Sequence, residues 1–360
     1  ANCVNHCGTG SVTAGKSEAS CMLFPVTGVS LKVGNSQGDR VSFDNDPIIR
    51  YRSETPILVA DRPWEEGASL RAISVVPEEG GKRQRLYYLT WHRGAFEKNA
   101  LCVAYTENGT DWEKPDLGEG NNIVMRGSGR ALDWGAFFPQ QVIHEPDCDD
   151  ENLHWKMVYW DRPTQAAIPG LCLAASRDGF TWRPLHDHPI VTNQNDGACL
   201  ITANEHNPIL WMDCKYYLYQ QTWKYNPTLP VDRDNMTKMH RRISIWAANG
   251  FGRRWVGPIS VLEPDEDDPP AHQFYWLTVF HTNKGYGGYL QIHDTVEQTE
   301  ALQLVTSEDG WQWQRQNDRR PILTPGGPGR FDSGMVFATC GPMVIGDKAF
   351  ILYGGQSWLH

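Results

Sequence analysis

Residues 106–112 have the sequence TENGTDW and follow an apolar run at 100–105, ALCVAY. An Asn-Gly or Asp-Gly step favours a tight turn, because glycine tolerates positive φ and the Asn or Asp side chain bonds the nearby backbone. The apolar run before the turn is of strand type, and the tryptophan after it begins the next strand. This stretch therefore predicts a β-hairpin whose tryptophan packs against a neighbouring strand.

The same pattern, [ST]-x-[DN]-G-x-x-W, returns along the chain. Two further copies are SRDGFTW at 176–182 and SEDGWQW at 307–313, and a degenerate copy, AANGFGRRW at 247–255, carries two extra residues. The copies start at residues 106, 176, 247 and 307, which are 70, 71 and 60 residues apart. One such hairpin is a generic signal, but four at nearly constant spacing predict a fold made of repeated sheets.

A second strand pair precedes the hairpins. The clearest pairs are 71–76 with 85–90, 135–143 with 154–160, and 335–345 with 348–353. Four strands in about seventy residues is the size of a propeller blade with generous loops. We therefore expect an all-β, five-bladed β-propeller over residues 27–360, with an irregular N-terminal arm at 1–26. Because the last unit ends early, we expect residues 29–51 to supply its missing outer strands and close the ring.

Carboxylates precede the predicted inner strands in a second repeat. They are Glu65 with Glu66, Asp133, Asp196 and Asp332. Every inner strand of a propeller begins at the same end of the central channel, so these side chains converge on one funnel. Like charges held close raise one another's pKa, and such a group can hold a proton donor beside an ionised carboxylate, as glycosidic bond cleavage requires. The alternative is structural, because Asp-x-Gly before a strand is also common turn chemistry.

These features together resemble the five-bladed propeller glycosidases, the fold shared by glycoside hydrolase families 32, 43 and 117 and their uncharacterised relatives. The resemblance is carried by the hairpins, by DRPWE at 61–65, and by the closing sequences DSGM at 332–335 and LYGG at 352–355. It covers most of the chain from about residue 57 onward. The Trp-x-Asn-Asp-Pro, Arg-Asp-Pro and Glu-Cys motifs of family 32 are absent, so the resemblance implies no particular substrate or stereochemical outcome.

The resemblance also implies roles for the acids. Those enzymes carry three acidic residues, one on each inner strand of the first three blades, which act as nucleophile or base, transition-state stabiliser and proton donor. By position, the counterparts are Glu65 (or Glu66), Asp133 and Asp196. In the third blade, Glu205 is an alternative to Asp196 for this role.

Three functions agree with this pattern. The first is a glycoside hydrolase that cleaves a poly- or oligosaccharide in the funnel, with Glu65, Asp133 and Asp196 as catalytic residues. The second is a lyase for acidic polysaccharide, in which His272 and Tyr275 form a base and acid pair and arginines neutralise the substrate. The third is a non-catalytic carbohydrate-binding propeller. The residues expected to line the substrate site are Trp64, Glu66, Arg71, His92, Trp134, Glu205, His206, His272, Tyr275 and Asp332.

The amino-acid composition limits the classes of molecule that the protein is expected to bind. The chain has a net charge of −10 and no basic stripe, which argues against nucleic acid. No apolar run approaches the ~18 residues that span a bilayer. The 15 Trp and 13 Tyr include candidates for stacking on sugar rings, with core packing as the alternative. We therefore expect a carbohydrate substrate and no cofactor, with a structural calcium ion as an alternative that has no recognisable ligand loop.

The chain has nine cysteines, an odd number, so at least one is unpaired or pairs elsewhere. Cys102 and Cys172 occupy equivalent apolar strands in two repeats, which favours core filling. A disulfide within the cluster of Cys3, Cys7 and Cys21 is an alternative. The sequence shows neither an initiator Met nor a signal peptide, and we expect a secreted or periplasmic protein. Nothing in the sequence indicates the oligomeric state.

Overall fold

The computed structural model describes residues 20–26, 51–130, 136–192, 194–195, 200–201, 206–230, 234, 236–346 and 348–359. Their regular structure is almost entirely β. The helices in this part of the chain are single 3-10 turns: η1 (Pro63–Glu65), η2 (Glu79–Gly81), η3 (Phe96–Lys98), η4 (Glu151–Leu153) and η5 (Asn317–Arg319). None of them is long and apolar enough to span a membrane.

The first two sheets follow the predicted strand order. The first has the order β2 (Ser69–Glu78), β3 (Arg83–Trp91), β4 (Ala100–Thr106) and β5 (Ile123–Arg126). The second contains β6 (Phe138–His144), β7 (Trp155–Asp161), β8 (Gly170–Ser176) and β10 (Val191–Thr192), with β9 (Arg183–Pro184) also paired to β8. In both sheets the ladders are antiparallel, as hairpin connections require.

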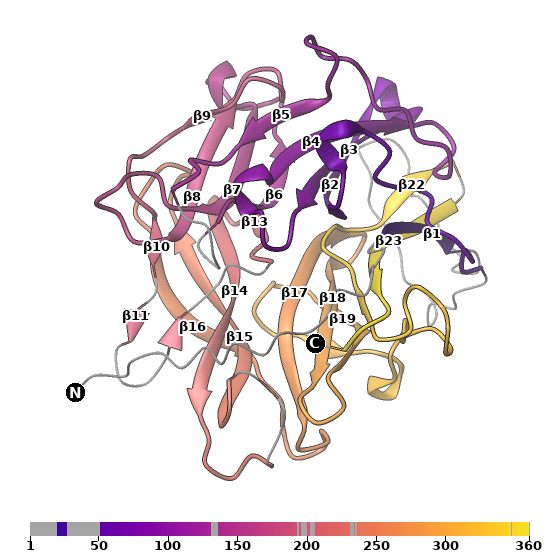
Figure 1. Ribbon diagram of the computed structural model, residues 1–360. Helices are drawn as coiled ribbons and strands as arrows, with labels where there is room; N and C mark the ends of the chain where they lie inside the picture. The colour runs from indigo at the N-terminus through magenta and orange to yellow at the C-terminus, as the bar shows by residue number, and fades with distance from the viewer. Residues whose placement is uncertain are drawn as a thin grey trace.

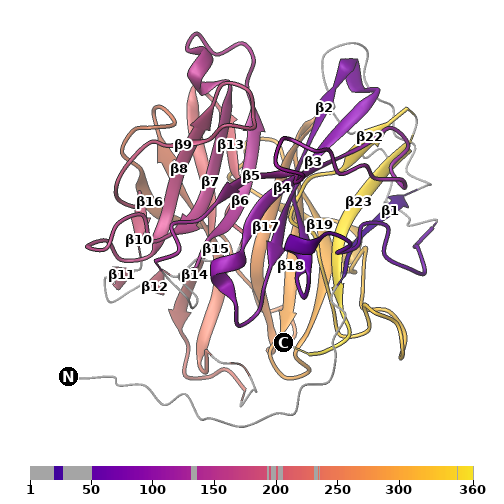
Figure 2. The ribbon, with the colours of Figure 1, turned by 45° about the horizontal axis from the view of Figure 1, so that its top comes forward.

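The third and fourth sheets are larger. The third contains β11 (Gln194–Asn195), β12 (Leu200–Ile201), β13 (Ile209–Met212), β14 (Lys215–Tyr225), β15 (Met239–Ala248) and β16 (Val256–Leu262). The fourth contains β17 (His272–Thr282), β18 (Gly285–Asp294), β19 (Thr299–Ser307), β20 (Gln314–Arg315), β21 (Met335–Phe337), β22 (Met343–Ile345), β23 (Lys348–Gln356) and β1 (Ser20–Val26). In Figure 1 the yellow β22 and β23 lie beside the indigo strands of the first sheet, and Figure 2 shows the same neighbours from a second direction.

The eight-stranded sheet merges the predicted fourth and fifth units. One parallel bridge, between Glu300 and Met335, connects β19 to β21. The ladders therefore define four sheets among the described residues, and the five-blade count stays a prediction. β1 pairs with β23 from Ser20 opposite Gly355 onward, so the arm predicted as irregular contains a strand. Of the segment expected to supply outer strands, residues 29–50 lie outside the described residues.

The hairpin turns form as the sequence predicts. In the copy at 176–182, Ser176 Oγ accepts a hydrogen bond of 2.9 Å from Gly179 N. Asp178 Oδ1 accepts bonds of 2.8 Å from the backbone N–H groups of Phe180 and Thr181. The first and last copies make the same bonds. Gly179 has a φ of +79°, a conformation that other residues adopt at a cost.

The turn glycines also lie against aromatic rings of neighbouring sheets. A Cβ atom on Gly179 would lie 2.5 Å from Tyr87 Oη, and Tyr87 donates a hydrogen bond of 3.0 Å to Gly179 O. A Cβ atom on Gly109 would lie 2.7 Å from the ring of Phe350 on β23. The turns therefore join one sheet to the next, and the contact of Gly109 with Phe350 joins the first sheet to the last.

Hydrogen bonds connect each sheet to the next around a central channel. They run from Val142 N to Ser74 Oγ (2.9 Å), from Ile209 N to Gln141 Oε1 (2.5 Å), from Gln221 Nε2 to Tyr275 O (2.6 Å), from Thr278 Oγ1 to Ala338 O (2.7 Å), and from Thr339 Oγ1 to Ala72 O. The last two bonds connect β17 to the segment after β21, and that segment back to β2. Side-chain bonds, rather than continuous ladders, hold the sheets around the channel.

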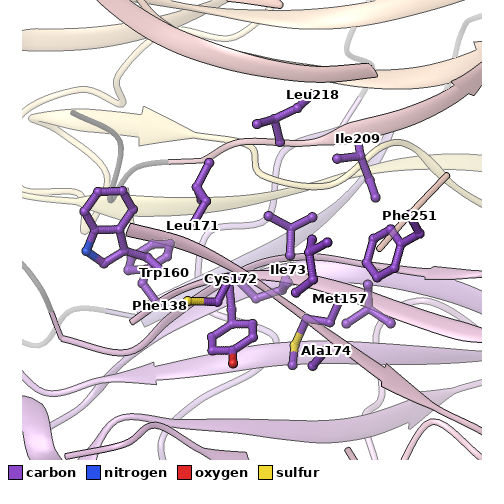
Figure 3. Close-up of a cluster of buried hydrophobic side chains, with 14 of the residues drawn as sticks. Ile73, Phe138, Met157, Trp160, Leu171, Cys172, Ala174, Ile209, Leu218 and Phe251 are labelled. Carbon is purple, nitrogen blue, oxygen red and sulfur yellow. The ribbon is translucent and has the colours of Figure 1, made fainter. Parts of the chain in front are cut away.

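The largest apolar cluster lies between the first three sheets. Figure 3 shows part of it, with Ile73 of β2, Met157 of β7 and Leu218 of β14 converging. Cys102 and Cys172 are buried and free, as core filling predicts. Burying apolar surface stabilises by about 25 cal/mol per Å², which makes such clusters the main stabilising contribution to each sheet contact.

Candidate active site

The channel has two distinguishable ends. At one end lies a cavity of about 550 Å³, lined by the second halves of β2 and β6, by β13, by the end of β17 and by residues 339–342. The innermost strands thus end together there, and they begin together at the opposite end. We call these ends the C-terminal mouth and the N-terminal mouth. The acids predicted to act precede the inner strands, and so belong to the N-terminal mouth.

Arg71, near the start of β2, lies among three aromatic rings at the N-terminal mouth. Its guanidinium carbon is 5.1 Å from the ring centroid of Phe337, 5.4 Å from that of Phe138 and 5.5 Å from that of Trp91. These rings come from β21, β6 and β3, so Arg71 lies where the first, second and last sheets meet. Aromatic faces hold a guanidinium in place, and its several N–H donors can bind more than one oxygen-rich group.

The aromatic floor continues across the channel. The ring of Phe337 lies 6.3 Å from that of Trp276, and Trp276 lies 5.3 Å from Tyr275, both edge to face. All three rings are at most 7% exposed. Their packing connects Arg71 to a polar network on the third and fourth sheets.

This network contains two carboxylates, a histidine and an arginine. Arg241 makes two hydrogen bonds to Asp234, at 2.7 and 3.0 Å. His293 Nε2 lies 3.5 Å from Asp234 Oδ1, and His293 Nδ1 lies 3.8 Å from Glu300 Oε1. The ring of His293 also lies 5.3 Å from that of Tyr275. All five side chains are buried, so the network is held rigidly at the mouth.

The surroundings set the charges of this network. Burial raises the pKa of Asp234, but hydrogen bonds from His293 and Arg241 outweigh that effect and hold the pKa below its usual range. Burial lowers the pKa of His293, more than its acidic neighbours raise it. At neutral pH the arrangement therefore presents an ionised carboxylate beside a neutral imidazole, and a neutral imidazole can accept a proton.

Four predicted site residues lie outside the described residues. They are Asp133, Trp134, Asp196 and Glu205. The two acids with the central catalytic roles, Asp133 and Asp196, therefore stay predictions. In the sequence, Asp133 precedes β6, and Asp196 comes after β11 and before β12.

Glu65 is fully buried, and both its oxygens are engaged. Oε2 accepts bonds from Lys114 Nζ (2.6 Å) and from the backbone N–H groups of Asp61 (3.0 Å) and Arg62 (3.2 Å), while Oε1 accepts one from Tyr88 (2.6 Å). Its exposed fraction is 0%. These contacts favour an anchoring role for Glu65 in the loop before β2, because a catalytic carboxylate must reach the substrate.

Asp332 has the same kind of environment. Oδ2 accepts bonds from Arg52 Nη2 (2.5 Å) and Tyr353 (2.7 Å), and Oδ1 accepts one from Arg330 Nε (3.3 Å). Its exposed fraction is also 0%. The turn-chemistry alternative thus suits Glu65 and Asp332 better than substrate contact does.

The remaining predicted site residues lie in different places. Glu66 is exposed, and Trp64 donates a bond of 3.0 Å from Nε1 to Asn122 Oδ1. His92 is 4% exposed, and burial lowers its pKa. His206 lines the cavity at the C-terminal mouth, and its ring also lies 6.4 Å, edge to face, from that of Trp276. The structure thus brings His206 to the same aromatic rings as Tyr275, but not into contact with Arg71.

The structure does not bring His272 and Tyr275 together as the predicted pair. Residues three apart in a regular strand point to opposite faces of the sheet, and a register shift of the ladder falls at Tyr275. His272 lies opposite Asp294, with Nε2 3.6 Å from Oδ2, whereas Tyr275 contacts His293. Strand parity counts against the pair from the sequence alone, but finding His293 required the register of β17 against β18.

Asp234, Arg241, His293 and Glu300 were not predicted as site residues. They come from a loop and three different strands, and no short motif connects them. Among the described residues, no group of three or more His, Cys, Asp or Glu side chains could hold a metal ion.

Comparison with known proteins supports the fold. No family model matches the sequence, and no curated protein matches it. The solved structure of a BT0996 RGII complex is 13% identical, with 81% of this chain and 90% of that protein covered and a TM-score of 0.51. A structure named "Glycoside hydrolase" is 12% identical, with 81% and 90% covered and a TM-score of 0.50. At these identities the likeness shows a shared fold.

Proposed function

We propose that the protein is a carbohydrate-active enzyme that cleaves glycosidic bonds at the N-terminal mouth. The observation that carries the proposal is the position of Arg71 among three aromatic rings at this mouth, with the buried network of Asp234, His293 and Glu300 behind them. Sites with a few fixed polar groups over aromatic walls are typical of small-molecule and sugar recognition. The shared fold with a structure named as a glycoside hydrolase agrees with this.

A five-bladed propeller is the finer fold that we propose. Hydrogen bonds connect β2 to β6, β6 to β13, β14 to β17, β17 to the segment after β21, and that segment back to β2. In such a ring the residues before each inner strand face one mouth. Asp133 and Asp196 then enter the same mouth as Arg71.

The chemistry that we propose uses Asp133 and Asp196. One protonates the leaving oxygen, and the other acts as nucleophile or base. Arg71 binds an oxygen-rich or anionic group of the substrate, and the buried aromatic rings around it hold its guanidinium in position. Glu65 and Asp332 hold the loops that carry this mouth in position.

Activity on a glycan panel tests this proposal. Reducing-end release from one or more members is expected, because hydrolysis frees a reducing end. Asp133→Asn and Asp196→Asn should each lower kcat by about 10²–10⁴-fold, the usual contribution of a general acid or base. The exposed Glu107→Gln, in an outer hairpin, is the matched control and should keep full activity. Full activity of both aspartate variants would contradict the assignment.

A second candidate, a lyase for acidic glycans, is favoured by one contact. His293 is neutral and lies against Tyr275, with Arg241 beside both. A base, a phenol and a guanidinium are what abstraction of a proton next to a uronate carboxylate needs. Elimination leaves a conjugated double bond, so new ultraviolet absorbance that is lost in Tyr275→Phe would support the lyase. Reducing-end release without that absorbance would exclude it.

A further inference from the structure

Two hairpins at the C-terminal mouth each carry a cross-strand ring pair. Trp211 of β13 lies opposite Tyr216 of β14, with ring centroids 4.5 Å apart. His281 of β17 lies opposite Tyr286 of β18, with centroids 5.4 Å apart. Trp211 is 42% exposed although Tyr216 packs against it. A large ring that is both fixed and exposed offers a platform for a flat apolar face.

A hollow lies between these hairpins. It has a volume of about 500 Å³ and is lined by Glu145, Trp211, His281 and Tyr286, among others. The first three of these residues also line the channel cavity of about 550 Å³. Both volumes fall in the range of about 300–1,000 Å³ that is usual for small-molecule sites. The two spaces therefore adjoin and share one rim.

Glu145 is a fixed acceptor at this rim. Its Oε2 accepts bonds from Lys156 Nζ (2.7 Å) and from the Tyr216 hydroxyl (2.6 Å). Among the described residues, none donates a hydrogen bond to its Oε1. The side chain of Lys156 is 1% exposed, so a buried cation compensates the carboxylate. An ionised carboxylate only accepts hydrogen bonds, which suits a hydroxyl group and disfavours a second carboxylate or a sulfate.

His206 supplies an independent sign that the cavity takes a polar ligand. It is 2% exposed and lines the cavity wall. No described group meets hydrogen-bond geometry with its ring nitrogens, although the backbone of Gln140 lies close enough to the ring to raise its pKa somewhat. Burial lowers its pKa to about 3, so the ring is neutral and offers one donor and one acceptor. The backbone of Gln140 serves at most one of the two ring nitrogens, so the other is left for a polar group within the cavity.

The geometry points to a second carbohydrate-binding site at the C-terminal mouth, which takes a neutral pyranose ring. The apolar face of the sugar stacks on Trp211, and its hydroxyl groups bind Glu145 and the neighbouring His281. The site is separate from the proposed active site, and its chemistry does not depend on turnover there. Two sites on one chain would bind a polymeric glycan more tightly than either site alone.

Fluorine NMR of protein labelled with 5-fluorotryptophan tests this site directly. The resonance of Trp211 is assigned by its absence in Trp211→Phe. The probes are the methyl glycosides of glucose, galactose, mannose and xylose, with glucuronate as the charged comparison and benzyl alcohol as the apolar one. At least one neutral glycoside should shift this resonance with saturation. The same titration on the Asp133→Asn variant should give the same shift, so the result does not depend on the proposed catalysis.

Two variants complete the test. Trp211→Ala should weaken binding of the active probe, followed by calorimetry, by about tenfold, the worth of one stacked aromatic ring. Tyr225→Ala is the matched control, because it removes an exposed aromatic ring from the other end of β14 and should leave affinity unchanged. A Trp211 resonance that no neutral glycoside moves would overturn the proposal. An equal shift with glucuronate, or a shift with benzyl alcohol alone, would also overturn it.

Discussion

Tyr88 donates a hydrogen bond of 2.6 Å to the fully buried carboxylate of Glu65. Tyr353 donates one of 2.7 Å to Asp332 in the same way. In both places an acid before an innermost strand is bound to a tyrosine on the next strand of its sheet. A nearby cation also binds each carboxylate: Lys114 binds Glu65, and Arg52 binds Asp332. The repeat of acids in the sequence is therefore, at these two positions, a repeat of anchoring contacts.

The first prediction concerns the stability that Glu65 provides. Glu65→Gln leaves the buried Lys114 without its partner, and breaking one side of such a pair costs up to about 3–5 kcal/mol. The second pair of Lys114, with Asp61 at 2.7 Å, should offset part of this cost. Urea denaturation should show a lower free energy of unfolding, while kcat per folded molecule stays near that of the wild type.

The exposed neighbour Glu66 is the control for this experiment. Glu66→Gln should change the free energy of unfolding by less than about 0.5 kcal/mol, as is usual for surface substitutions. A Glu65→Gln protein of normal stability and no activity would restore Glu65 to the catalytic group and contradict the anchoring role.

The second prediction concerns the turn of the second sheet. Gly179→Ala places a side chain on a residue with a φ of +79°, and its Cβ would meet the hydroxyl of Tyr87 at 2.5 Å. Left-handed strain costs about 1–3 kcal/mol, and the clash adds to it, so thermal denaturation should show a clearly lower Tm. Gly327→Ala is the control, because nothing lies within 4 Å of a Cβ atom there. Equal Tm values for the two variants would contradict the docking of this turn.

Local chemistry explains why the fold could be read from the sequence. The Ser, Asp and Gly of each turn act on backbone groups at most three residues away, so the motif alone predicts its hydrogen bonds. The aromatic ring that contacts each turn glycine is distant from it in the sequence, as Tyr87 is from Gly179. No sequence pattern identifies that ring. The merging of β19 with β21 depends on a single bridge, which local signals do not contain.

The residues of the candidate active site were predicted less well than the fold, because their contacts also join segments that are distant in the sequence. Arg71 was predicted as an arginine that could neutralise an acidic substrate, and Tyr275 as the partner of His272 at the start of an innermost strand. Asp234 belongs to a connecting segment, and its partner His293 lies on a strand of another sheet. Buried acids and functional acids look alike before their partners are known. Glu65 shows this, because its role became visible only with Lys114 and Tyr88 in place.

The third prediction concerns substrate binding by Arg71. Arg71→Met removes a charge that can make charge-assisted hydrogen bonds, each worth about 1.5–3 kcal/mol. KM should therefore rise by about 10-fold to 100-fold, with a smaller change in kcat. Arg71→Lys should recover part of the loss, because it restores charge but not the planar contact with three rings. The exposed Arg93→Met is the control, and an unchanged KM in Arg71→Met would exclude a role in binding.

The fourth prediction concerns the dependence of stability on pH. The folded pKa of His206, about 3, lies below its unfolded value near 6.5. The unfolded state therefore binds the proton more readily, so this stabilisation is complete above about pH 6.5 and is lost as the pH falls from there toward 3. One such histidine adds a slope of about 1.4 kcal/mol per pH unit in that window. Denaturant unfolding between pH 7 and pH 5 should show that slope reduced in His206→Gln, whereas the exposed His188→Gln leaves it as in the wild type. An equal slope in all three proteins would mean that His206 is charged, or exposed, in the folded state.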